Sequence, residues 1–157
     1  MKTTIRQILG LGAMLAVSGA WSIPAQAQEI FAGKYGQQTG EDLYKGICQG
    51  CHMPDAKGAT GAGAYPALAS NPRLAAAIYP ITVVLNGQRA MPSFGHDNPP
   101  FAAGLTDVQI ANVLNYVRTH FGNQYQDVIT PQTVKTARRQ SEIDRTSEAI
   151  NKAAASH

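Results

Sequence analysis

The pattern of apolar and polar positions along this 157-residue chain predicts an all-α fold. Apolar side chains recur at helical spacing in several short segments, and no segment alternates convincingly with the period of two that is typical of strands. The clearest apolar stripe comprises Ile110, Val113, Leu114 and Val117. Thr106 and Gln109 are spaced as a capping box ahead of this stripe, so we expect the last core helix to begin there and to be ended by Gly122.

Shorter helical segments are predicted ahead of this helix. One runs from about Gly40 to Cys48, with an apolar face made by Leu43, Tyr44 and Ile47. Residues 53–65 are rich in glycine and alanine and show no periodicity, so they are predicted to form a loop.

Two prolines set the helix boundaries in the middle of the chain. Asn71-Pro72 combines an N-cap residue with proline at the first helical position, and the helix that starts there is short because Pro80 interrupts it. Pro80 opens the next helix, whose apolar face is made by Ile81, Val84 and Leu85. Residues 88–104 then form a long loop, and loops of this length in compact domains tend to be functional or disordered.

Residues 1–27 have the features of a cleaved secretory signal. Lys2 and Arg6 form a basic start, Ile8 to Ala20 is a short apolar run, and residues 25–27 supply a small-residue cleavage site. A membrane-spanning helix normally needs about 20 apolar residues, so we expect no span after cleavage. An uncleaved N-terminal anchor is the alternative. Residues 28–39 are predicted to be an extended lead-in, followed by one core domain over residues 40–122.

Residues 123–157 form a C-terminal extension. Thr130-Pro131 is a helix start, and we expect a short helix to about Arg139. Residues 140–157 are polar and are expected to be frayed or disordered. Because the extension offers little apolar surface, the core domain is not expected to depend on it.

The charge of the chain excludes little. Its formal net charge is +3, and the loss of Lys2 and Arg6 with the signal would bring it closer to neutral. No basic stripe points to nucleic acid as a partner.

The candidate chemistry lies in Cys48-Gln49-Gly50-Cys51-His52, which has the spacing of covalent c-type haem attachment. On a helix these spacings place both thiols and the imidazole on one face, so the thiols can add to the two haem vinyl groups while His52 reaches the iron. The alternatives are a dithiol redox motif, a zinc half-site or chance. A thioredoxin-like motif would need a surrounding βαβ pattern, and a zinc site would need a second ligand pair, whereas the chain holds two cysteines in all.

The chain resembles a class I c-type cytochrome over residues 38–122. The haem motif, a Met91-Pro92 loop and the last core helix follow one another in that family's order. The resemblance implies a fold of short helices packed around one covalent haem c. It is nearest to single-haem bacterial cytochromes that serve periplasmic dehydrogenases, which implies a location in the periplasm.

The resemblance also implies a ligand set for the iron. Met91 matches the family's distal methionine, and a soft, neutral thioether stabilises ferrous iron. Met91 could instead be a core filler, and His96, on the same loop, is the rival ligand; His120 is expected to be partly exposed. Pro66 resembles the family proline whose carbonyl accepts a hydrogen bond from the proximal histidine, His52, although it could also be an ordinary loop proline.

Further matches concern packing and charge. Gly40, Tyr44 and Tyr116 fall where the family places a glycine and two aromatic residues at a helix contact. Arg89 could pair with a haem propionate, or could be a solvated loop arginine.

The implied function is one-electron transfer from a periplasmic dehydrogenase toward a terminal oxidase or another cytochrome, rather than catalysis on a substrate. The chain would act as a free carrier or as the cytochrome subunit of a dehydrogenase complex, and the extension is the feature that could decide between these. Two alternatives remain open. One is a haem enzyme or gas sensor with a labile distal ligand, and the other is a dithiol oxidoreductase without haem that uses Cys48 and Cys51.

Overall fold

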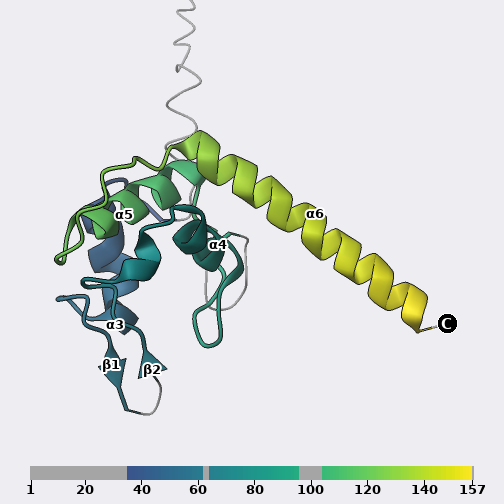
Figure 1. Cartoon of the computed structure of the whole chain (residues 1–157), viewed down its shortest axis with the longest axis horizontal. Coiled ribbons are helices and arrows are strands. Elements are labelled where there is room, and N and C mark those ends of the chain that lie inside the picture. The colour runs from purple at the N-terminus through teal and green to yellow at the C-terminus, as the bar shows by residue number, and fades with distance from the viewer. Residues whose placement is uncertain (1–34, 62–63, 96–103, 157) are drawn as a thin grey trace, which may run out of the picture.

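The computed structural model describes residues 35–61, 64–95 and 104–156 (Figure 1). The predicted signal over residues 1–27, residues 28–34 of the predicted lead-in, and the rival ligand His96 lie outside the described residues.

The described chain is mostly helical, as the sequence predicts. In chain order its elements are α2 (Gly40–Leu43), the π-helical turn η1 (Tyr44–Cys48), α3 (Gln49–His52), β1 (Ala59–Thr60), β2 (Ala64–Tyr65), the 3₁₀ turn η2 (Pro72–Leu74), α4 (Ile78–Asn86), α5 (Asp107–Thr119) and α6 (Pro131–Ala155). The two strands pair antiparallel within the segment predicted to be a loop. Strands of two residues are too short to show an alternating pattern, which is why the sequence did not reveal them.

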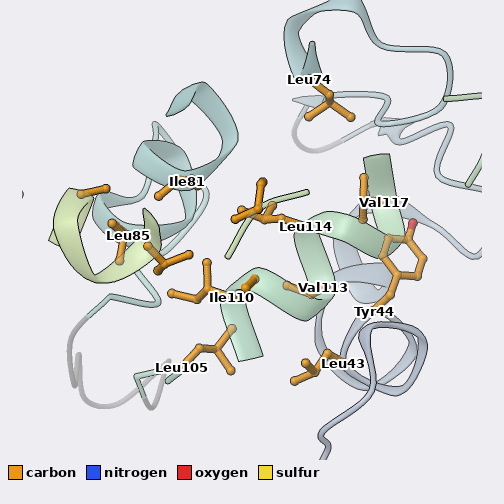
Figure 2. Packing of buried hydrophobic residues seen from close by; sticks show 14 of the residues in the cluster. Leu43, Tyr44, Leu74, Ile81, Leu85, Leu105, Ile110, Val113, Leu114 and Val117 are labelled. Carbon is orange, nitrogen blue, oxygen red and sulfur yellow. The ribbon is translucent and has the colours of Figure 1, made fainter. Parts of the chain in front are cut away.

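Helix α5 lies at the centre of the core. Figure 2 shows its side chains Ile110, Val113, Leu114 and Val117 between residues of α4 on one side and of α2 and η1 on the other. The predicted capping box is present, because Thr106 accepts a hydrogen bond from the Gln109 amide while the Gln109 side chain accepts one from the Thr106 amide. Such a cap fixes where the helix begins. The helix itself ends at Thr119, and Gly122 follows with a positive φ of 80°.

The predicted close approach of two helix backbones at Gly40 is present. A Cβ atom on Gly40 would lie 2.3 Å from the carbonyl oxygen of Asn112 and 2.6 Å from Cβ of Tyr116, so only glycine fits. Tyr116 also stands 5.9 Å from Tyr44, ring centre to ring centre. This contact packs the helical segment that carries the haem motif against α5.

The extension differs from the prediction. Helix α6 does not end near Arg139 but continues to Ala155, so the prediction that residues 140–157 are frayed or disordered is wrong for the described part. Ile129, Val134 and Ala137 are buried in the same core as α5, which places the core boundary beyond residue 122. Beyond Ser141 every described residue is exposed, and α6 projects away from the body (Figure 1).

Polar side chains of α5 attach the extension to the core. Asn115 exchanges two hydrogen bonds with the backbone of Ile129, at 2.8 and 2.9 Å. Arg118 is fully buried and donates to the carbonyl oxygens of Leu74 and Ala75 and to the carboxylate of Asp127. Buried polar groups with this many partners hold the two segments in one arrangement. Among the described helices, none has the length and apolar character needed to cross a membrane.

Candidate functional site

The five-residue motif lies at the end of an unbroken helical run from Gly40 to His52. The wide π turn Tyr44–Cys48 ends at the first cysteine of the motif, and π turns of this kind are frequent at functional sites. Met53 ends the run with a positive φ of 66°. Within the motif Cys48 is half-buried, Cys51 is exposed and His52 is buried with 8% of its surface accessible.

The hydrogen bond of His52 determines which ring nitrogen is free. Its Nδ1 lies 2.9 Å from the carbonyl oxygen of Pro66, which is the contact that the family resemblance implies. A carbonyl oxygen can only accept, so Nδ1 carries the proton and donates it to this bond. In the neutral ring Nε2 is then the unprotonated nitrogen, with a lone pair available for a metal ion.

Gly58 fixes the carbonyl that His52 uses. Its backbone amide donates to the carbonyl oxygen of His52 at 3.1 Å. With a φ of 68°, its Cα faces the Tyr65–Pro66 backbone so closely that a Cβ would lie 2.1 Å from the Tyr65 oxygen and 2.9 Å from the Pro66 oxygen. Gly58 therefore joins the end of the motif helix to the acceptor, and any larger residue would displace Pro66.

Residues 91–95, the Met91 segment, fold back on the end of α4. Met91 and Gln88 exchange two backbone hydrogen bonds, at 3.0 and 3.1 Å. Further along, the amides of Phe94 and Gly95 donate to the carbonyl oxygens of Val84 and Leu85. Gly87 permits this fold, because a Cβ at its φ of 74° would lie 2.7 Å from the Met91 oxygen. Met91 is half-buried, so its side chain is not enclosed in the core in the way that a simple filler would be.

An aromatic cluster supports the motif from the side of α5. Tyr44 packs against Phe121 with ring centres 4.7 Å apart, and its hydroxyl donates to the carbonyl oxygen of Met53 at 2.6 Å. Burial raises the pKa of Tyr44 to about 12, so the ring stays neutral and the hydrogen bond is kept. The carbonyl that accepts it belongs to the residue after His52.

The Cys48 thiol does not have the lowered pKa of a redox-active cysteine. Burial, and secondarily the proximity of Cys51, raises the pKa of the Cys48 thiol to about 12. Reactive dithiol motifs lower the pKa of one cysteine, because the thiolate is the nucleophile. The described residues also contain no group of three or more His, Cys, Asp or Glu side chains placed to share a metal ion.

The donor set therefore fits a c-type haem. It combines two thiols at the attachment spacing, an imidazole whose Nε2 is free, and a thioether on a half-buried segment. His120 does not join them, because it is exposed, stacks on Tyr116 and has its Nδ1 2.8 Å from the Tyr116 carbonyl oxygen. Arg89 is exposed, with a positive φ of 55°.

Sequence reasoning missed Gly58 and Gly87 as residues that shape the site. Gly58 lies in a segment predicted only as a loop, and Gly87 lies between a predicted helix and the predicted loop 88–104. At neither position does the sequence indicate which backbone the glycine approaches. One signal was present at Gly87, which directly follows the last residue of α4, a position where a positive φ is common.

The chain matches known proteins over most of this region. Residues 36–117 match the family described as cytochrome c oxidase, cbb3-type, subunit III. The chain is 35% identical over 109 residues to the fructose dehydrogenase cytochrome subunit of Gluconobacter japonicus, covering 63% of this chain and 22% of that protein. It is 29% identical over 121 residues to the cytochrome c subunits of the quinone-type alcohol dehydrogenases of Gluconacetobacter polyoxogenes and Komagataeibacter europaeus, covering 73% of this chain and 25% of each of them. It thus spans about a quarter of the length of these relatives.

Proposed function

Because this chain belongs to the class I c-type cytochromes, we propose that it is a periplasmic one-electron carrier with a single covalent haem c ligated by His52 and Met91. The observation that carries this proposal is the hydrogen bond from His52 Nδ1 to the Pro66 carbonyl at 2.9 Å. It leaves Nε2 as the free ligand atom and sets the orientation of the ring beside the two cysteines.

Each residue of the donor set has a role in this proposal. Cys48 and Cys51 would hold the haem through thioether bonds, with His52 as proximal and Met91 as distal ligand. When bound, haem c supplies a couple between ferrous and ferric iron that carries one electron. Pro66 and Gly58 orient the His52 ring. The backbone hydrogen bonds of the Met91 segment hold the residue whose sulfur would bind the iron. A soft thioether favours the ferrous state, which suits a protein that accepts electrons from a dehydrogenase.

The proposed donor is a periplasmic dehydrogenase, and the proposed acceptor is a terminal oxidase or another cytochrome. The relatives support the donor, since they are cytochrome subunits of fructose and alcohol dehydrogenases. Redox encounter interfaces are often small and weak, which suits repeated exchange of partners. The chain would act as a free carrier or as a subunit of the dehydrogenase complex.

Two measurements test this function. The visible spectrum of the purified protein should show a low-spin c-type haem in both oxidation states, with a sulfur-to-iron charge-transfer band in the oxidised state. Mass spectrometry after denaturation should give the mass of the polypeptide plus one haem. An apoprotein mass from a host with working haem-attachment machinery would overturn covalent attachment. A high-spin spectrum would instead favour the haem enzyme or gas sensor.

A further inference from the structure

Arg138 of α6 makes three contacts outside its own helix. Its Nε donates to the carboxylate of Asp107 at 2.8 Å, its Nη2 donates to the carbonyl oxygen of Leu105 at 2.9 Å, and its Nη1 donates to the carbonyl oxygen of Gly95. The Arg138 side chain is 19% exposed and that of Asp107 25%. The planar guanidinium group holds its donors in a fixed fork, so one side chain fixes these acceptors relative to one another.

The acceptors lie where three parts of the fold meet. Gly95 ends the segment that begins at Met91, and its amide donates to the Leu85 carbonyl at the end of α4. Leu105 lies just before α5, and its amide donates to the Phe94 carbonyl at 2.7 Å. Asp107 is the first residue of α5. Gly95 and Leu105 are both buried, so their carbonyl groups need partners inside the protein.

The Met91 segment is consequently held at two ends. Its first end is the backbone pair of Met91 with Gln88, and its second is Gly95, between the Leu85 carbonyl and the Arg138 guanidinium. The approach at the second end is close, because a Cβ on Gly95 would lie 2.4 Å from the Leu85 oxygen. Gly95 lies four positions after Met91, so movement at Gly95 reaches Met91 through a short length of chain.

We propose that Arg138 is a positioning residue for Met91, and that the first half of α6 is a brace for the distal ligand segment rather than an appended tail. This inference rests on the proposed function in one respect, which is that Met91 is the iron ligand. Loss of Arg138 removes one of the two contacts that hold Gly95, which loosens the segment and lets the Met91 sulfur move away. The effect is greatest in the oxidised protein, because a soft thioether binds ferric iron less well than ferrous iron.

The test uses oxidised full-length holoprotein and imidazole as an exogenous ligand that competes with Met91. Arg138→Gln removes the charge and the fork, and Arg138→Lys keeps the charge without the fork. Arg139→Gln is the matched control, because Arg139 is the exposed neighbour on the same helix. Val134→Ala is a second control, because Val134 is buried on α6 but makes none of these contacts.

We expect Arg138→Gln to bind imidazole at least about tenfold faster than the wild type and to show a weaker charge-transfer band, since a hydrogen bond to a charged group is lost. The imidazole binding rate and the band of Arg138→Lys should lie between those of Arg138→Gln and the wild type. Arg139→Gln should match the wild type, and Val134→Ala should lower the melting temperature without changing the rate.

Two results would overturn the proposal. One is an imidazole rate and a band in Arg138→Gln equal to those of the wild type. The other is an equal rise in rate in Val134→Ala, which would show that general loosening of α6 is the cause. If the wild type itself lacks the band, the proposed His/Met ligation fails first. If Arg138→Gln does not mature, Arg138→Lys decides by the same two readouts.

Discussion

The orientation of His52 depends on Gly58, because a residue with a Cβ atom does not fit at this position. Alanine there would need a φ near 68° and would bring its Cβ within 2.1 Å of the Tyr65 oxygen. Positive φ and backbone displacement cost about 1–3 kcal/mol at such positions. We expect Gly58→Ala to lower the melting temperature and shift the reduction potential, because the His52 acceptor moves. Potentiometry and melts should be compared with Gly61→Ala, where nothing lies within 4 Å. An unchanged reduction potential would show that Gly58 does not influence the haem through His52.

The distal ligand is a second prediction at the scale of one side chain. Met91→Ala should abolish the charge-transfer band of the oxidised protein and lower the reduction potential, because the soft donor to ferrous iron is removed. Absorption spectra and potentiometry measure both effects. Survival of the band would show that another sulfur, such as that of Met53, binds the iron, whereas absence of the band from the wild type would favour His96.

Tyr44 gives a prediction about pH. Its pKa rises from an ordinary value near 10 to about 12 on folding, chiefly through burial. The neutral ring is the form that the fold favours, so its contribution to stability is complete below pH 10 and is lost as the pH rises toward 12. In Tyr44→Phe the hydrogen bond to the Met53 carbonyl is absent, which costs about 1 kcal/mol at pH 7. Chemical denaturation at pH 7 and pH 11 should show the two proteins converging at the higher pH.

At the scale of elements, the sequence predicted best where local signals and packing agree. Helix α5 has a capping box, an apolar stripe and a buried position, and each of these points to the same helix. The end of α6 has none of them, because a helix that is polar on every side shows no apolar periodicity. The site divides in the same way. The spacing of Cys48, Cys51 and His52 predicts a haem-attachment motif from the sequence alone, whereas the contact of Arg138 with Gly95 depends on tertiary packing that no local pattern contains.

The start of the extension provides a prediction at this scale. Ile129 has 2% of its surface exposed, whereas Ile143 on α6 is 52% exposed. Ile129→Ala should therefore lower the free energy of unfolding by about 2–5 kcal/mol, since it leaves a cavity in the core. Ile143→Ala should change it by no more than about 0.5 kcal/mol. Denaturant titration of the two holoproteins would show the difference. Equal effects would mean that the side chain of Ile129 is not packed in the core.

At the scale of the whole molecule, α6 divides into two halves with different roles. Its first half belongs to the core through Val134, Ala137 and the contacts of Arg138. Its second half, from Glu142 onward, is exposed throughout the described residues. Isolated helices of this length are marginal in water, so a helix that projects from the body draws little stability from itself. The second half is thus the part that a dehydrogenase could contact at no cost to the cytochrome core.

Two truncations separate these roles. A chain ending at Gln126 lacks Ile129 and Arg138, and we expect it to mature poorly or to melt far below the wild type. A chain ending at Ser141 keeps every buried residue of the extension, so its spectrum, Met91 ligation and melting temperature should match the wild type. If the second half of α6 docks a dehydrogenase, this shorter chain should be reduced more slowly by the dehydrogenase of its host and equally fast by ascorbate, which needs no docking. Equal rates with both reductants would remove the docking role and leave α6 as a brace alone. A changed spectrum in the chain ending at Ser141 would instead show that the core reaches further along α6 than its burial indicates.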